Sequence, residues 1–175
     1  EDFPEVARLL DIATRVHDES GGRFQVKDGV ALLDGEEMPP VLASRLADFV
    51  DRDIDTQPLV LFWNNLSTNP DPVVRSDLFV FLEHNGVVLT ASGCFIAYKR
   101  VSNDLKDLRT GQIDNSPGQR PNMPREQVDP DRHHTCSRGL HVAAYEYADT
   151  MYCDGVMIEC EIDPRNVVAI PTDYN

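Results

Sequence analysis

This sequence is poor in long apolar runs, paired cysteines and basic residues. No apolar run approaches the length needed to span a bilayer, and no charged-then-apolar leader opens the chain. The four cysteines form no C-x-x-C pair, so we expect reduced thiols in a cytosolic compartment. The 16 Lys and Arg stand against 30 Asp and Glu, a net charge of −14, which argues against phosphate-tracking nucleic-acid binding across the whole surface.

Sequence signatures of catalysis and of nucleotide binding are missing too. The chain has no Walker loop, no G-x-G-x-x-G and no G-x-S-x-G elbow. No catalytic set can be assembled from the residues, so we expect no cofactor and favour a non-enzymatic role, with an enzyme kept as the alternative. The first residue is not methionine, so we expect an excised part of a longer protein.

The remaining composition is that of a globular chain with a core. Hydrophobic residues make up 41% and charged residues 26%, both ordinary values. The pattern of elements predicts an α+β fold, with a helical and hairpin lobe over 1–86 packed on a mixed β-sheet core over 87–175 as one compact unit.

Four helices and a hairpin are predicted in the first half. Asp-Gly turn dipeptides between alternating apolar residues predict the hairpin over 23–38. Asp71 and Pro72 are typical of a helix start, and Trp63 has the helical spacing of a core residue. Apolar residues at three- and four-residue steps predict helices over 4–16, over 41–50, from Pro58 to Asn69, and from Asp71 to Asn85.

The second half reads as strands around a long loop. The polar segment 102–135 has no apolar period, and we expect an ordered loop laid over the surface. Two strands flanking a helix could pair in parallel as a crossover unit, and a sheet of mixed direction is equally open. The predicted elements are a hairpin of 87–89 with 94–101, a strand over 140–143, a helix over 145–153, and strands over 156–162 and 167–170.

Basic residues gather near the long loop although the chain is acidic. Lys99 lies near the end of a buried strand, where it either points to solvent or faces a site. Together with Arg125 and Arg138 it could converge on an anion. Scattered, solvated charges are the plainer alternative, and our first expectation for Arg138 is that it pins the loop through Asp114 or Asp129.

Zinc-ligand residue types cluster where the loop ends. His133, His134, Cys136 and His141 fall within nine residues, but their spacing matches no zinc pattern. Solvated histidines in a polar loop are the alternative. Cys136 lies near Arg138 and could attack as a thiolate, or it could be a structural thiol. The candidate ligand or functional residues are Lys99, Asn115, Arg125, Cys136, Arg138 and His141.

Five sequence blocks carry a family resemblance. They are Tyr98-Lys99, the segment from Asp114 to Gly118, the segment from Met123 to Arg125, the segment from Thr135 to Val142, and the segment from Asp163 to Asn175. In this order and spacing they resemble the rIIB family of T-even-like phages. Coverage runs from about residue 20 to the end of the chain, and the TCSRGLHV and DNSPG blocks are long enough to be specific.

The resemblance implies a role and partners but no reaction. Family members protect a lytic phage against exclusion by a resident prophage, which implies a phage accessory protein that evades host defence through protein–protein interaction. The implied partner is an rIIA-like phage protein or a host defence protein. The implied location is the host cytoplasm, with peripheral association at the inner membrane through a partner. The family's N-terminal helix-turn-helix-like region is lacking here, so we expect no nucleic-acid binding through this fragment.

Two alternatives to that role stay open. The strand ending at Lys99, the strand around His141, and the following helix and strand are similar to the NAD-binding half of ADP-ribosyltransferases. Lys99 would replace the usual first-strand residue there, and no catalytic Glu is identifiable, so the likeness is one of fold. The second alternative is a metal-stabilised interaction domain built on the histidine cluster.

Overall fold

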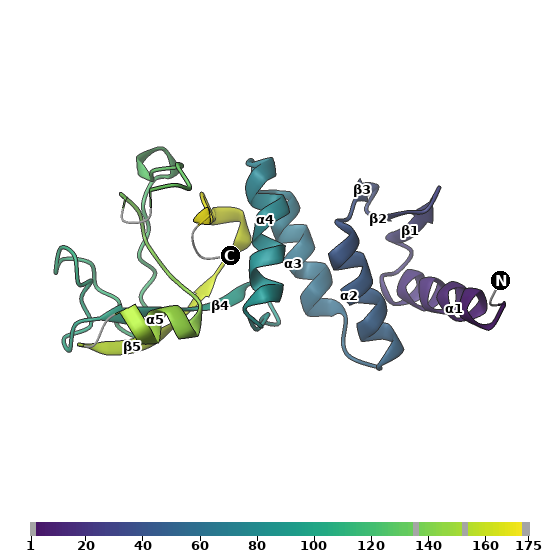
Figure 1. The fold of residues 1–175 in the computed structure, drawn as a ribbon, viewed down its shortest axis with the longest axis horizontal. Coiled ribbons are helices and arrows are strands. Elements are labelled where there is room, and N and C mark those ends of the chain that lie inside the picture. The colour runs from purple at the N-terminus through teal and green to yellow at the C-terminus, as the bar shows by residue number, and fades with distance from the viewer. Residues whose placement is uncertain (1–2, 135–136, 152–153, 173–175) are drawn as a thin grey trace.

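The computed structural model describes residues 3–134, 137–151 and 154–172. Figure 1 shows an elongated molecule, with the N-terminal helices at one end and the long loop with its sheet at the other. The α+β class predicted from the sequence is confirmed. We call residues 3–86 the helical lobe and residues 87–172 the sheet lobe. The predicted division of the chain at residue 86 into two lobes stays a prediction.

Four α-helices form where the apolar periodicity predicts them. They are α1 (Phe3–Glu19), α2 (Pro40–Asp51), α3 (Gln57–Ser67) and α4 (Pro72–His84). The start of α4 has the predicted chemistry, because a side-chain oxygen of Asp71 accepts a hydrogen bond from the backbone N–H of Val73 at 2.8 Å.

The predicted hairpin is confirmed and gains a short third strand. Strands β1 (Phe24–Lys27), β2 (Val30–Leu33) and β3 (Glu36–Glu37) pair antiparallel in that order. Asp28 and Gly29 between the first two strands have φ of 52° and 80°. Two consecutive positive φ angles are typical of a type I′ turn, whose twist matches that of the strands it joins.

The apolar core lies mainly in the helical lobe. Trp63 is 6% exposed and belongs to it, as its spacing predicts. The sheet lobe adds Phe95, Ala97 and Ile170 to the same cluster. The fully buried apolar side chains of the helical lobe are Leu33, Leu42, Leu46, Val50, Leu59, Phe62, Leu66 and Leu78.

The sheet lobe is built on one long antiparallel pair. Strand β4 (Phe95–Val101) pairs with β5 (Val156–Ile162) over all seven residues. Helix α5 (Tyr145–Met151) packs on one face, where the rings of Tyr98 and Tyr145 meet edge to face at 5.2 Å between centroids. Single turns of 3₁₀-helix interrupt the irregular segments at η1 (Arg125–Gln127) and η2 (Pro164–Asn166).

The predicted crossover unit and mixed sheet are wrong for the described residues, where every strand pairing is antiparallel. The segment 140–143 forms only one bridge, from Ala143 to Tyr98, and so lies on the opposite side of β4 from β5. β4 therefore separates the two segments that could have paired in parallel. The predicted strand over 167–170 is not formed either, because the carbonyl of Val167 accepts hydrogen bonds from side chains instead.

The turn before β4 fixes the sheet lobe against α3. Gly93 has a φ of 72°, and a Cβ atom there would lie 2.4 Å from the backbone carbon of Leu61. The side-chain amide of Asn65 donates to the carbonyls of Ser92 and Gly93, both at 3.1 Å. Only glycine allows the two backbones to approach this closely in this conformation.

Candidate functional site

Lys99 and His141 meet where the long loop joins the sheet. Lys99 is half-buried in β4, opposite Ile158 of β5, and its ammonium donates a hydrogen bond to the backbone carbonyl of His141 at 2.9 Å. The side chain thus ties segment 140–143 to β4 beside the Ala143 bridge. The sequence left open whether Lys99 points to solvent or faces a site. In the structure its ammonium contacts another segment of the same chain.

The surroundings of Lys99 disfavour positive charge. Burial lowers the pKa of the Lys99 ammonium, and the nearby Cys160 and Asp107 partly offset this. Partial desolvation lowers the pKa of the His141 imidazole, and the charges of Lys99 and Arg109 lower it further. Burial raises the pKa of the Cys160 thiol. The cluster therefore favours a neutral imidazole and a neutral thiol beside the Lys99 ammonium.

Asp107 organises the loop and was not predicted as a site residue. It is 6% exposed and accepts hydrogen bonds from the backbone N–H groups of Thr110, Gln112 and Ile113, and from the Thr110 hydroxyl, at 2.7 to 3.0 Å. Burial opposes ionisation, but these donors together hold the pKa of the Asp107 carboxyl well below its usual range. The run Asp-Leu-Arg-Thr-Gly is the sequence signal, since Asp and Thr commonly accept from backbone N–H groups two or three residues on.

Arg109 was also missed by the sequence reasoning. One of its guanidinium nitrogens donates to the carbonyl of Ser137 at 2.7 Å, which joins the start of the long loop to its end. Its charge acts on His141, as the lowered pKa of that imidazole shows. No local pattern distinguishes this arginine from the others in the loop.

Arg125 lies at the junction of the two lobes rather than beside Lys99. Its guanidinium donates to the side-chain oxygen of Asn69 at 3.2 Å and to the carbonyls of Val167 and Arg165 at 3.1 and 3.3 Å. Asn69 is fully buried, and its amide donates to the carbonyls of Pro164 and Val167 at 2.8 and 2.9 Å. Arg125 therefore acts as a structural link through a buried asparagine.

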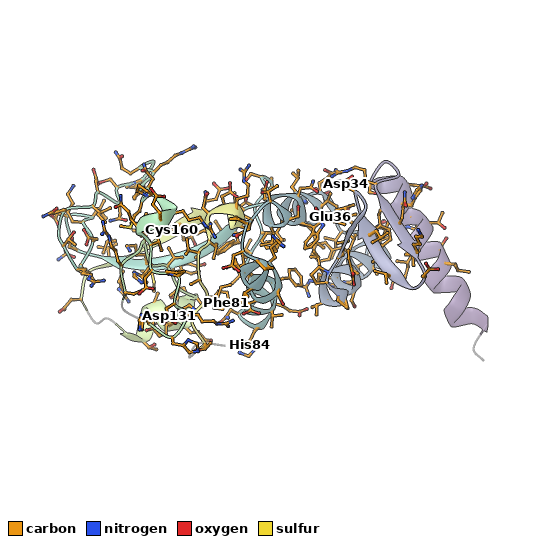
Figure 2. All side chains as sticks on the ribbon, turned by 90° about the horizontal axis from the view of Figure 1, so that it is seen from above. Asp34, Glu36, Phe81, His84, Asp131 and Cys160 are labelled. Atoms are coloured by element: carbon orange, nitrogen blue, oxygen red, sulfur yellow. The ribbon has the colours of Figure 1, made fainter. Side chains whose placement is uncertain are left out.

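A second arginine crosses the same junction. Arg132 forms an ion pair with Asp77 of α4, in which each side chain is 28% exposed. In the view of Figure 2, Asp131 of this loop lies toward the same side of the molecule as Phe81 and His84 of α4. The loop is thus laid over the helical lobe as well as over the sheet, which fits the ordered loop that the sequence predicts.

Arg138 and Asn115 have separate partners. Arg138 donates to the side-chain oxygen of Gln127 at 2.8 Å, so the predicted carboxylate partner is wrong. The two proposed carboxylates bind other groups, Asp114 with Lys106 and Asp129 with His134, because these partners lie nearer along the loop. The Asn115 side chain donates to the carbonyl of Ile113 at 2.8 Å. The hydrogen bonds thus bring Lys99 and His141 together, and hold Arg125, Arg138 and Asn115 in other sets of contacts.

The histidines of the metal hypothesis pair with aspartates. His133 contacts Asp131 at 3.0 Å, and His134 contacts Asp129 at 3.1 Å, which raises the pKa of the His134 imidazole. In residues 3–134, 137–151 and 154–172, His, Cys, Asp and Glu form no group of three that could hold a metal ion. Cys136 lies outside the described residues.

Two open hollows lie on the helical lobe. One of about 300 Å³ opens between the hairpin and α3 and is lined by Arg23, Asp34, Glu36, Trp63 and Asn64, among others. Figure 2 shows Asp34 and Glu36 on this side of the molecule. Arg23 is paired with the Asp34 carboxylate and donates to Asn64, so its charge is already compensated.

The contacts define a class of protein: an acidic α+β chain in which a polar loop is fixed by arginine and aspartate to a small antiparallel sheet and to a helical lobe. The family model described as Bacteriophage T4 protein rIIB matches residues 11–175, and the chain belongs to this family. Protein rIIB of Enterobacteria phage T4 is 32% identical over 172 residues, which cover 98% of this chain and 55% of that protein. The chain thus spans about half the length of this curated relative.

No solved structure matches the chain. Among the helices of the described residues, none has both the length and the apolar character that crossing a membrane requires.

Proposed function

We propose that this chain is part of a phage accessory protein that counters prophage-mediated exclusion, or another host defence, through protein–protein contacts. The observation that carries the proposal is the family match over residues 11–175. The expected partner is an rIIA-like phage protein or a host defence protein. The protein acts in the host cytoplasm and reaches the inner membrane only through that partner.

The arrangement of the sheet lobe supports a binding role over a catalytic one. The polar residues that the sequence singles out mostly bind neighbouring backbone or side-chain groups, as Arg125 and Arg138 do. Lys99 is engaged by a backbone carbonyl. Groups held in this way preserve the shape of a surface, which is what recognition of another protein requires.

Affinity capture from infected cells tests this proposal. The full-length protein that contains this chain serves as bait, and the captured proteins are identified by mass spectrometry. We expect an rIIA-like phage protein or a host defence protein among them, together with loss of plating on a strain that carries an excluding prophage when the gene is deleted. Normal plating of the deletion mutant on such strains would overturn the anti-exclusion role.

A second candidate function is nucleotide binding, and one observation favours it. Lys99 and His141, the two residues that the ADP-ribosyltransferase likeness places at the nicotinamide, are in direct contact through the His141 carbonyl. Calorimetry with NAD distinguishes the candidates. Saturable binding of NAD that is lost in Lys99→Met would support the nucleotide candidate, and no heat at millimolar NAD would eliminate it.

A further inference from the structure

The two sides of β4 are both covered. On one side lies β5, and on the other side three short segments follow one another along the strand. They are joined to β4 by backbone hydrogen bonds from Ile96 to Val88, from Tyr98 to Ala143, and from Ser102 to Lys106, at 3.0, 2.8 and 2.9 Å. β4 is therefore the central strand of this sheet.

The outer edge of β5 has no such cover in the described part of the chain. Because Tyr98 bonds to Ala143, its opposite residue Glu159 must point its own backbone groups away from β4. The same alternation turns the N–H and C=O groups of Met157 and Glu161 outward. Backbone hydrogen bonds from these three residues to another described segment are not found. Figure 1 places β5 at the border of the molecule.

The side chains along this edge form two rows of different chemistry. On the face away from α5, Val156 is 40% exposed and Ile158 and Cys160 are half-buried, so this row is apolar. On the face with α5, Glu159 and Glu161 are exposed, and the Glu161 carboxylate accepts hydrogen bonds from the hydroxyls of Thr90 and Ser92 at 2.9 and 2.6 Å. Natural proteins blunt strand edges with proline, a bulge or charged side chains, whereas β5 has no proline, keeps a regular seven-residue register, and carries only acidic residues among its charged side chains.

We propose that the outer edge of β5 binds an extended segment of a partner protein in which apolar and basic residues alternate. The segment adds a strand through the backbone groups of Met157, Glu159 and Glu161. Its apolar residues lie beside Ile158 and Cys160, and its basic residues face the acidic row, chiefly the carboxylate of Glu159. The inference rests on the proposed function in one respect, since both require a protein partner.

A second copy of this chain does not fit the same edge. Two copies paired antiparallel about Glu159 would place this carboxylate opposite its own counterpart. Like charges directly opposite each other on neighbouring strands destabilise pairing. The net charge of −14 adds a repulsion of longer range between copies. The acidic row therefore selects a basic strand from another protein.

Fluorescence anisotropy with a labelled, capped peptide of alternating lysine and valine tests the edge directly. The protein variant is Glu159→Pro, because residue 159 donates no hydrogen bond to β4, so proline removes its outward N–H and its carboxylate and leaves the bonds to β4 in place. Glu159→Gln is the matched control that keeps the N–H and removes the charge. We expect about tenfold weaker binding for Glu159→Pro, the ratio that loss of one or two backbone hydrogen bonds produces, and a smaller loss for Glu159→Gln.

A modified peptide keeps the test independent of how the variant folds. N-methylation of alternate backbone nitrogens in the peptide removes its donors while its charge is unchanged, and the unmodified protein is used. We expect this peptide, and an analogue with glutamate in place of lysine, to lose binding. Equal binding of the methylated and unmethylated peptides, or no binding of the lysine peptide at all, would overturn the inference.

Capture with the full-length protein and its Glu159→Pro variant separates this inference from the proposed function. If both baits recover the same phage or host partner equally, the edge inference fails and the binding function stands. If the wild-type bait recovers no partner while the lysine peptide still binds the β5 edge, the proposed function fails and the edge inference stands.

Discussion

Different interactions stabilise the interiors of the two lobes. In the helical lobe, eight of the largest fully buried side chains are aliphatic or aromatic, and they form one continuous cluster. In the sheet lobe, the corresponding set contains Val101 and Pro164, and the contacts that organise the loop are hydrogen bonds to buried or half-buried polar groups such as Asp107.

This difference separates two kinds of stability. Apolar burial in the helical lobe is non-directional and grows with the area removed from water. Hydrogen bonds in the sheet lobe contribute little net stability each, but a buried group that loses its partner is costly. The helical lobe should therefore respond to lost volume, and the sheet lobe to lost partners.

The largest effect is expected from Phe62→Ala in α3. Phe62 is fully buried and packs against Phe79, so its removal leaves a cavity as well as lost apolar contact. We expect the free energy of unfolding to fall by about 3–5 kcal/mol. Urea unfolding followed by the fluorescence of Trp63, the single tryptophan, measures it. Val80→Ala on the same lobe is 53% exposed and should change stability by less than about 0.5 kcal/mol.

The next largest effect is expected from Asn69→Ala at the lobe junction. The variant leaves the carbonyls of Pro164 and Val167 without their amide donor. We expect a loss of about 2–3 kcal/mol by the same urea measurement. Asn85→Ala is the control, because that amide is exposed and bonds only locally to Phe81. Equal losses in the two variants would show that the junction asparagine is not a special link.

Asp107→Asn is expected to weaken the sheet lobe and to change its response to acid. The loss should be about 1–2 kcal/mol at neutral pH, because the amide cannot accept all the hydrogen bonds that the carboxylate accepts. The folded pKa of Asp107 is depressed, so its contribution is fully present above the unfolded value, about 3.9, and is lost as the pH falls below it.

Stability measured across this pH range checks the assignment. The wild-type protein should lose more stability than Asp107→Asn as the pH falls from about 5 to about 2. Asp104→Asn, a change at an exposed residue of the same loop, serves as the comparison. Parallel curves for wild type and Asp107→Asn would contradict the buried, hydrogen-bonded carboxylate.

The smallest effect is expected from Lys99→Met. Removal of a half-buried charge is favourable, and loss of the hydrogen bond to the His141 carbonyl is unfavourable, so the two largely cancel. We expect a change within about 1 kcal/mol at neutral pH. The burial-lowered pKa also means that wild-type stability rises as the pH increases through the folded pKa of Lys99, and the variant should lack this rise. A loss as large as that of Asn69→Ala would assign Lys99 a much larger structural role.

The same contrast explains how far the sequence could predict the fold. Helices α1 to α4 and the hairpin follow from spacing and turn residues, since the signals for them lie within a few neighbouring positions. The direction of the sheet could not be predicted in this way. Whether 140–143 and β5 pair with each other or both lie against β4 depends on contacts between segments that are far apart in the chain.

The candidate site was harder to predict for a related reason. The sequence singled out Lys99 and His141, which do meet, because both lie in segments with strand character. It assigned Arg138 to a carboxylate, whereas the nearest acceptor is the neutral Gln127. Asp107 and Arg109 were overlooked since their importance comes from burial and from partners that charge alone does not identify.

The position of β4 also sets the order in which the protein can fold as it leaves the ribosome. Its partner β5 is synthesised only after the whole loop. The Val167 carbonyl, which accepts a hydrogen bond from the Asn69 amide, is synthesised 98 residues after Asn69. The helical lobe contains its own apolar core and can fold while the rest is still being made. The sheet lobe, in contrast, can close only after β5 has been synthesised, so until then β4 is an exposed strand that must be kept from pairing with other chains.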